Sequence, residues 1–150
     1  MNIPLTQGKT SSVDKKDFEY LSQWKWYAVF DGYNWYAGRS VKGRILKMHT
    51  VIMKPAKGME IDHANRNGLD NRRINLRIST HQQNSMNRKT RRDNTSGFKG
   101  VNWDIIHKYW VARIQTKGVR IVLGQFHSKE EAYEAYYKAC IKYHGAYAKP

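Results

Sequence analysis

The stretch "IDHANRNGLDNRRINLR", residues 61–77, decides how the first half of this chain is interpreted. It opens with an Asp-His pair, contains an Asn-Gly turn and ends in a segment rich in Arg and Asn. Ile74, Leu76 and Ile78 alternate with other residues, which predicts a strand that carries these three side chains on one face. The stretch therefore predicts a strand, a polar loop and a second strand.

A helix is expected directly after the second strand. Ser79 and Gln82 fit a Ser-x-x-Gln capping box, in which the two residues satisfy backbone N–H groups at the start of a helix. We expect this helix to run to about Lys89. The motif of two strands and a helix then covers about residues 60–89.

The Asp-His pair has the chemistry needed to hydrolyse a phosphodiester. Asp62 offers an oxygen ligand for a divalent cation, and His63 offers a general base beside it. Strand alternation sends the two side chains to opposite faces unless the strand ends there. A second ligand is expected from the helix, whose face carries His81, Asn84 and Asn87. The alternative is an Asp-His pair that only bonds the loop, with the Asn residues as turn formers.

Residues 45–90 resemble the HNH endonucleases of the phage and intron-encoded homing type. Asp-His, a loop with Asn and Gly, Asn-Leu-Arg and a helix with Gln-Gln-Asn appear in that order and carry the resemblance. The resemblance implies a ββα-metal fold that binds one divalent cation, Mg²⁺ or Mn²⁺. It also implies Asp62 and Asn84 as the metal ligands and His63 as the general base.

The same resemblance implies roles for residues around this centre. Asn75 would hold the loop by side-chain hydrogen bonds, so that His63 keeps its orientation. His49 stands where the family has a His-Arg pair, although Thr50 replaces the Arg, and it is counted among the DNA contacts.

The chain is strongly basic, which predicts a polyanionic partner. Its 27 Lys and Arg residues outnumber 12 acidic residues and give a formal net charge of +15. Nucleic acid is the commonest partner for such a field, with a merely solubilising surface as the alternative. The phosphate contacts expected in and after the nuclease motif are Arg66, Arg72, Arg73, Arg77, Arg88, Arg91 and Arg92. Because Arg72 and Arg73 cannot both face one way on a strand, one of them is expected to serve the fold through Asp70.

The composition also limits the class of protein. No apolar run is long enough to cross a membrane, and the N-terminus lacks the apolar stretch of a signal peptide. The single cysteine, Cys140, excludes an intrachain disulfide and a cysteine-rich zinc ribbon, and we expect it to be buried packing. A cytoplasmic protein without a membrane partner is therefore expected.

Two domains are expected, with a boundary near residue 93. The segment "KTRRDNTSG" is basic, polar and small, which predicts a linker at residues 91–97 between domains at 1–90 and 98–150. The second domain is expected to be a three-stranded antiparallel sheet made from three β-rich runs, 98–105, 109–116 and 119–126. Ser128 and Glu131 form a capping box for a helix that would pack on this sheet.

One face of the predicted sheet suits a DNA groove. Trp110, Ala112 and Ile114 are expected to face the helix, so Arg113 and Gln115 would face outward. Arg can bond guanine and Gln can bond adenine in the major groove.

Residues 95–147 resemble the Apetala-type, ethylene-response-factor-like DNA-binding domain, which also occurs fused to HNH nucleases in phages and bacteria. Gly-Val at 100–101, Trp110, the Leu-Gly-x-Phe run at 123–126 and the Ser-x-Glu-Glu-Ala helix start carry it. Plant members favour Arg where this chain has Asn102 and Asp104, and Asp104 could accept from cytosine or avoid phosphate. By position, the resemblance implies sheet-face contacts from Lys99, Asn102, Asp104, Arg113, Gln115, Arg120 and Val122.

Together these features predict an α+β, metal-dependent HNH DNA endonuclease that nicks one strand of double-stranded DNA per event. The second domain would choose the site, with one divalent cation per active site and no small-molecule cofactor. A monomer is expected, with a dimer as the alternative, encoded by a phage or mobile element and acting in a bacterial host cell. The rival functions are a sequence-specific DNA-binding regulator with an inert nuclease fold and an RNA-acting enzyme. The narrow major groove of A-form RNA disfavours the latter.

Overall fold

The computed structural model describes every residue of the chain except 89, 91, 92, 149 and 150. The chain divides into two compact units, Met1–Asn84 and Ser85–Pro150. The expected linker at 91–97 lies within the second unit, and its residues 91 and 92 are outside the described part. No helix in the described part is long and apolar enough to cross a membrane.

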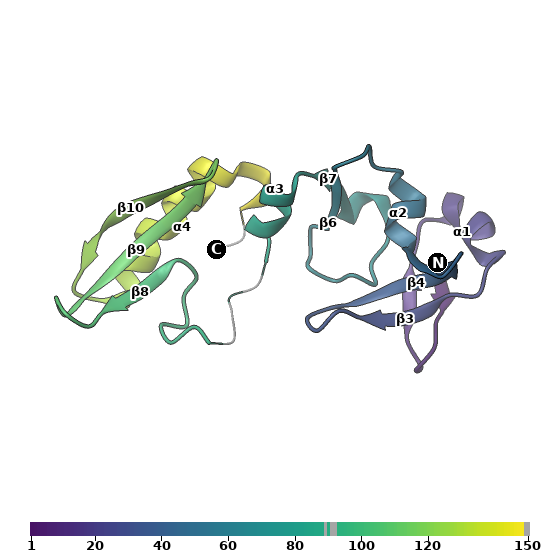
Figure 1. Ribbon diagram of the computed structural model, residues 1–150, viewed down its shortest axis with the longest axis horizontal. Helices are drawn as coiled ribbons and strands as arrows, with labels where there is room; N and C mark the ends of the chain where they lie inside the picture. Colours follow the sequence, from purple (N-terminus) through teal and green to yellow (C-terminus); the bar gives the residue numbers. More distant parts are fainter. Residues whose placement is uncertain (89, 91–92, 149–150) are drawn as a thin grey trace. The chain divides into compact units, whose positions relative to one another are not determined.

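The first unit is built from small antiparallel sheets and short helices (Figure 1). Its strands pair as β1 (Asn2–Pro4) with β2 (Thr10–Ser12), as β3 (Tyr27–Phe30), β4 (Trp35–Val41) and β5 (Arg44–Lys47) in that order, and as β6 (Glu60–His63) with β7 (Leu76–Ser79). Its helices are α1 (Lys15–Ser22), α2 (Met48–Met53), the 3-10 turn η1 (Arg73–Asn75) and the start of α3 (His81–Met86), whose last two residues belong to the second unit.

Helix α2 packs against the β6–β7 hairpin. Met48 and Ile52 of α2 are buried in one core with Ile61 of β6 and Leu76 of β7. Because side chains alternate along a strand, His63 points to the same side as Ile61, whereas Asp62 points to the other side. The hairpin therefore presents two chemically different faces.

The prediction that Ile74, Leu76 and Ile78 lie on one face of a strand is wrong for Ile74. Ile74 is 89% exposed because residues 73–75 form the 3-10 turn η1 instead of strand. The backbone N–H of Arg73 donates to Asp14 Oδ2 at 2.8 Å, which ties this turn to the start of α1. The strand therefore begins only at Leu76.

The capping box of α3 lies one residue later than predicted. Thr80 Oγ1 accepts from the Gln83 N–H at 3.2 Å, and Gln83 Oε1 accepts from the Thr80 N–H at 2.9 Å. Ser79 is buried at the end of β7, because it is still paired with Glu60 in the hairpin. The helix also ends earlier than expected, at Met86.

The second unit is an antiparallel sheet with one long helix. Strands β8 (Val101–Asp104), β9 (Tyr109–Thr116) and β10 (Val119–Phe126) lie in the order β10-β9-β8, and α4 (Lys129–His144) is followed by the 3-10 turn η2 (Gly145–Tyr147). Figure 1 shows α4 along one face of this sheet. The Ser128–Glu131 capping box is present at its start.

Small residues let α4 lie close to the sheet. Ala132 and Cys140 of α4 are fully buried against a core that includes Ala112 and Ile114 of β9. Cys140 is thus packing, as expected, and its Sγ lies 3.4 Å from His144 Nδ1.

Candidate active site

Asp62 is buried on one face of the β6–β7 hairpin and is paired across the strands. It lies opposite Arg77 in the register, and the residue is 3% exposed. Its Oδ2 accepts a hydrogen bond from Arg77 Nε at 3.0 Å and forms an ion pair with the same guanidinium. A buried carboxylate needs such a partner, because removing its charge from water costs several kcal/mol.

Glu60 adds a second carboxylate to the Asp62 side of the hairpin. It lies two positions before Asp62 on β6, so the two side chains share a face. Its carboxylate accepts from Asn84 Nδ2 at 2.6 Å and lies 2.7 Å from His81 Nδ1. Glu60 thereby holds α3 against the hairpin and places the Asn84 amide on the side that carries Asp62. Sequence reasoning missed Glu60, although strand alternation could have found it.

The donor atoms on this face suit a hard divalent cation. Asp62 and Glu60 offer carboxylate oxygens and Asn84 offers an amide oxygen, the ligand types that Mg²⁺ and Mn²⁺ prefer. Within the described part of the chain, no group of three or more His, Cys, Asp or Glu residues could hold a metal ion. Mg²⁺ does not require one, because it commonly uses one or two carboxylates and keeps several waters.

His63 lies at the end of β6, within a group of rings on the opposite face. The residue is 6% exposed, and its ring centroid lies 5.1 Å from that of His49 and 5.8 Å from that of Tyr36. Its Nε2 lies 3.3 Å from Asn71 Oδ1. Burial is the main cause that lowers the pKa of His63, so the ring is neutral at neutral pH.

His49, an expected DNA contact, belongs to this ring cluster. It is buried on α2, and its ring centroid lies 5.7 Å from that of Tyr36. Burial, followed by the charges of His63 and Lys47, lowers the pKa of His49 to about 3. The Lys47 ammonium lies 4.1 Å from the centroid of the Tyr36 ring. His49 is therefore a neutral packing partner of His63 in this structure.

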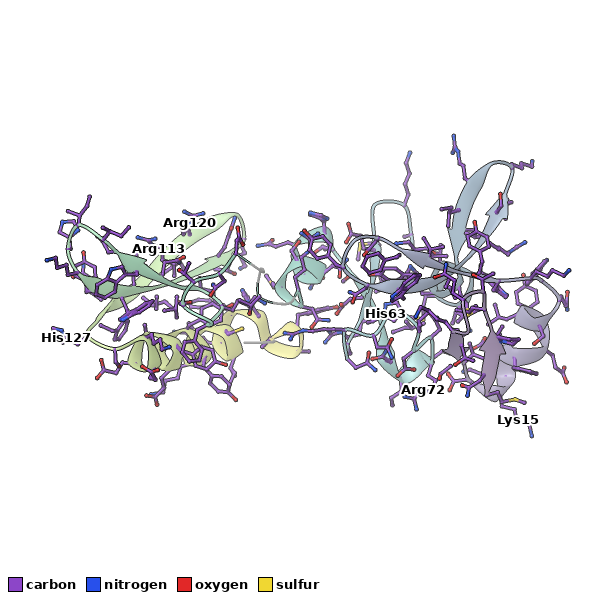
Figure 2. The ribbon with its side chains drawn as sticks, turned by 90° about the horizontal axis from the view of Figure 1, so that it is seen from below. Lys15, His63, Arg72, Arg113, Arg120 and His127 are labelled. Atoms are coloured by element: carbon purple, nitrogen blue, oxygen red, sulfur yellow. The ribbon has the colours of Figure 1, made fainter. Side chains whose placement is uncertain are left out.

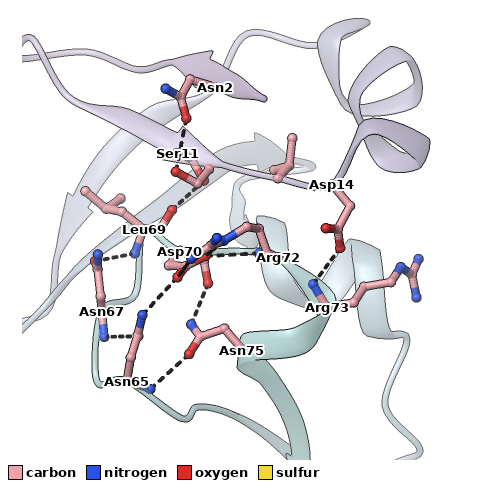
Figure 3. A network of polar contacts seen from close by, with 12 residues as sticks. Asn2, Ser11, Asp14, Asn65, Asn67, Leu69, Asp70, Arg72, Arg73 and Asn75 are labelled. Carbon is pink, nitrogen blue, oxygen red and sulfur yellow. Dashed lines mark hydrogen bonds and ion pairs between the residues drawn. The ribbon is translucent and has the colours of Figure 1, made fainter.

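Asn75 holds the loop between the two strands, as Figure 3 shows. Its Oδ1 accepts from the Asn65 N–H at 2.9 Å, and its Nδ2 donates to the Asp70 carbonyl at 2.7 Å. The same loop carries Asn71, whose Nδ2 donates to Ser11 Oγ at 2.8 Å while its Oδ1 faces His63. The amide side chains of Asn71 and Asn75 therefore fix the loop that contacts His63.

Three arginines of the motif, Arg72, Arg73 and Arg77, are paired with carboxylates. Arg72 donates through Nε and Nη2 to the two oxygens of Asp70, both at 2.7 Å, which is the role expected for one member of the Arg72–Arg73 pair. Arg73 makes an equivalent bidentate pair with Asp17 of α1, both at 2.8 Å. Asp17 was not foreseen because it is 56 residues away in the sequence.

The remaining basic residues expected on phosphate lie in different settings. Arg66 adopts a left-handed backbone conformation in the loop, with φ of 63°. Arg88 is exposed, whereas Arg91 and Arg92 lie outside the described residues. Lys99 donates from Nζ to the carbonyls of Met86 at 2.5 Å and Arg88 at 3.0 Å, so it ties down its own segment.

The sheet of the second unit has an outer face away from α4. Figure 2 shows Arg113 and Arg120 on that face, and Asn102, Gln115 and Val122 share it by strand alternation and register. Asp104 instead accepts from the Ile106 and His107 N–H groups at 3.1 and 3.0 Å. Its role in the structure is to close the β8–β9 turn, and these hydrogen bonds, chiefly from the His107 backbone, lower the pKa of Asp104.

Comparisons with known proteins agree with the chemistry of the hairpin. The family model described as HNH endonuclease matches residues 54–86, the segment that holds β6, β7 and α3. A protein of Acanthamoeba polyphaga mimivirus, named as an uncharacterized HNH endonuclease, is 30% identical over 147 residues, which cover 91% of this chain and 75% of that protein. Protein 3.8 of Escherichia phage T7 is 33% identical over 95 residues, 62% of this chain and 76% of that protein. No solved structure matches the chain.

The chain therefore belongs to the HNH endonuclease family, and it is a nuclease. The similarity to the mimivirus protein covers 91% of the chain and so reaches into both units.

Proposed function

We propose that this nuclease is a metal-dependent, homing-type DNA endonuclease that nicks one strand per event. One observation carries the proposal: the β6–β7 hairpin bears oxygen donors on one face and a neutral imidazole at the end of the same strand. Asp62 and Asn84, with Glu60 beside them, would hold one Mg²⁺ or Mn²⁺ ion. When bound, that ion would supply electrostatic stabilisation for charge that develops on the phosphate.

His63 is the general base in this proposal. An amide oxygen only accepts hydrogen bonds, so the contact with Asn71 Oδ1 assigns the proton of the neutral ring to Nε2. The lone pair then lies on Nδ1, which takes the proton from the attacking water. Because the residue is only 6% exposed, the residues over it must shift when substrate binds.

Arg77 connects metal binding with phosphate binding. In the structure its guanidinium neutralises Asp62. A cation at Asp62 would take over that role, which leaves Arg77 available for a phosphate oxygen. This exchange would restrict the active arrangement to the complex with metal and DNA.

Targeting by the second unit is the other part of the proposal. Arg113, Gln115 and Arg120 present guanidinium and amide groups on the sheet face away from α4, as an Apetala-type domain would. The chain would act as a monomer in the cytoplasm of a host cell, encoded by a phage or mobile element, and its viral relatives support this setting. Family membership does not favour an inert fold that serves only as a regulator.

Supercoiled plasmid distinguishes a nicking enzyme from a DNA-binding protein. We expect open-circular product with Mg²⁺ or Mn²⁺ and none with EDTA. His63→Ala should lower the nicking rate by roughly 100-fold or more, the usual contribution of a general base, while DNA binding stays unchanged. His127→Ala removes an exposed histidine of the second unit and should nick like the parent. Absence of nicking in every divalent cation would refute the proposal, as would full activity of His63→Ala.

Targeting is tested separately with DNA fragments selected from random sequence. Arg113→Ala should reduce the preference for the selected site over scrambled DNA by roughly 1–3 kcal/mol, with little change in the cleavage step. Lys138→Ala, on α4 away from the sheet, should retain the parent's preference. Equal discrimination by the Arg113 variant and the parent would exclude base reading by this residue.

A further inference from the structure

The β8–β9 turn displays two large apolar side chains to solvent. Ile105 is 80% exposed and Ile106 is 83% exposed, and Trp103 beside them is 42% exposed. Single exposed apolar residues are common on protein surfaces, but adjacent ones next to a proposed binding face mark a contact site. Neither isoleucine contributes to the core under α4.

The turn holds these side chains in a fixed position. Asp104 Oδ1 accepts from the N–H groups of Ile106 and His107, and the Lys108 N–H donates to the Asp104 carbonyl at 2.8 Å. The His107 ring stacks on Tyr109, with centroids 5.5 Å apart. A turn fixed in this way loses little conformational entropy when a partner binds.

The isoleucines form one wall of a shallow hollow on the outer face of the sheet. The hollow has a volume of about 490 Å³ and includes the buried Val111 of β9. Asn102 and Arg113 line it as well and supply an amide and a guanidinium. The site therefore combines an apolar surface with hydrogen-bond donors.

Among the four DNA bases, thymine suits this combination in the major groove. Its edge carries an acceptor, O4, beside a 5-methyl group that the other three bases lack. A phosphate group would make no favourable contact with two isoleucine side chains. An apolar peptide side chain would form no hydrogen bond with the Arg113 guanidinium. The net charge of +15 favours binding to DNA over binding to a basic or neutral protein.

We propose that Ile105 and Ile106, above the buried Val111, contact thymine methyl groups, and that the second unit thereby selects target sites with thymine at fixed positions. This inference rests on the proposed targeting function of the second unit. Arg113 and Asn102 donate to O4 or to the edge of a neighbouring base from the same hollow. The two isoleucines are then specificity-determining residues that sequence resemblance did not assign.

Replacement of thymine by deoxyuridine tests the contact, because it removes the methyl group and keeps every hydrogen-bonding atom. The full chain, in EDTA to prevent cleavage, is first used to select its preferred site from random DNA. Each thymine of that site is then replaced singly by deoxyuridine. We expect at least one replacement to weaken binding by about fourfold, the effect of one methyl group returned to water.

A double variant shows which side chains read the methyl group. Ile105→Ser combined with Ile106→Ser should bind the thymine site more weakly than the parent and should not distinguish thymine from deoxyuridine. Ile141→Ser, at an exposed isoleucine of α4, should keep the parent's distinction. All three isoleucines are exposed, so thermal unfolding of both variants should match that of the parent.

Several results would overturn the inference. Selected sites without a constant thymine, or sites that tolerate deoxyuridine everywhere, would exclude methyl recognition. A double variant that binds weakly yet still distinguishes the two bases would make the turn a general contact, such as an inserted wedge or a protein-binding patch. If the full chain prefers no sequence at all, the proposed targeting function fails and this inference fails with it.

Discussion

At the residue scale, the ion-paired arginines of the nuclease motif differ in how far their pairs are shielded from water. Arg72 and Arg77 each pair with a carboxylate, but the side chain of Arg72 is 52% exposed and that of Arg77 is 21% exposed. Their partners, Asp70 and Asp62, are both buried. The pair at Asp62 is shielded from water and lies on the proposed metal-binding face, so its loss should have the larger effect.

Substitution of Arg77 therefore reports on the metal site without any measurement of cleavage. Arg77→Met leaves Asp62 buried without its cation, which should cost about 3–5 kcal/mol of unfolding free energy in EDTA. Mg²⁺ should restore part of this loss, because a bound cation neutralises the same carboxylate. Urea unfolding with and without Mg²⁺ measures both effects.

Arg72→Met provides the control for this prediction. The Arg72 side chain is half exposed, so water reaches its pair with Asp70 and the loss should destabilise the protein much less than Arg77→Met, and Mg²⁺ should not change that effect. An Arg77 variant as stable as the parent in EDTA would contradict the importance of the buried pair. Equal effects of Mg²⁺ on both variants would argue against a cation at Asp62.

At the element scale, local sequence patterns predict the presence of helices and strands better than their exact positions. The Ser128–Glu131 capping box is a local signal, and it correctly marks the start of α4. Near α3, Ser79 and Thr80 offer competing caps, and pairing of Ser79 in the hairpin decides for Thr80. Local patterns cannot reveal that competition, because it depends on the neighbouring strand.

Local sequence patterns also predict only part of the candidate site. Asp62, His63 and Asn75 are named by the order of the motif, and the neighbouring Glu60 could have been found by alternation. Tyr36 and Asn71 reach His63 from another sheet and from the loop, and no local pattern predicts those contacts. The pairing of Arg73 with Asp17 is equally nonlocal.

Close packing between α4 and the sheet makes a specific demand on one glycine. A Cβ on Gly100 would lie 2.2 Å from ring carbons of Tyr136 and 2.8 Å from the Arg113 carbonyl oxygen, and its φ is 74°. Gly100→Ala should therefore destabilise the second unit by roughly 2–4 kcal/mol, from overpacking together with backbone strain. Gly118→Ala is the control, because its φ is 79° but a Cβ there meets nothing within 4 Å. Its cost should be about 1–2 kcal/mol, the strain alone. Thermal unfolding measures both effects. Equal stability of the two variants would contradict the packing argument.

At the scale of the whole molecule, a net charge of +15 coexists with a neutral, buried group of rings. The charge attracts DNA over a distance, whereas the ring cluster of Tyr36, His49 and His63 depends on the absence of charge. Protonation of either histidine would bury a cation beside Lys47. Acid should therefore weaken the first unit even while it raises the net positive charge.

The pH dependence of stability follows from the pKa of His49. Burial lowers that pKa from 6.5 to about 3 in the folded protein, so the unfolded chain binds more protons between these two values. Stability from this residue is fully present above about pH 6.5 and is lost as the pH falls toward 3, by on the order of 3 kcal/mol between pH 7 and pH 4. The lowered pKa of His63 acts in the same direction.

Urea unfolding at pH 7, 5 and 4 can follow the Trp26 indole N–H by NMR, because it donates to the Leu21 carbonyl inside the first unit. His49→Gln should flatten this dependence, whereas His127→Gln, at an exposed site, should not. A parent protein equally stable at pH 7 and pH 4 would show that the ring cluster tolerates a proton, and the argument for a neutral His63 would lose its basis.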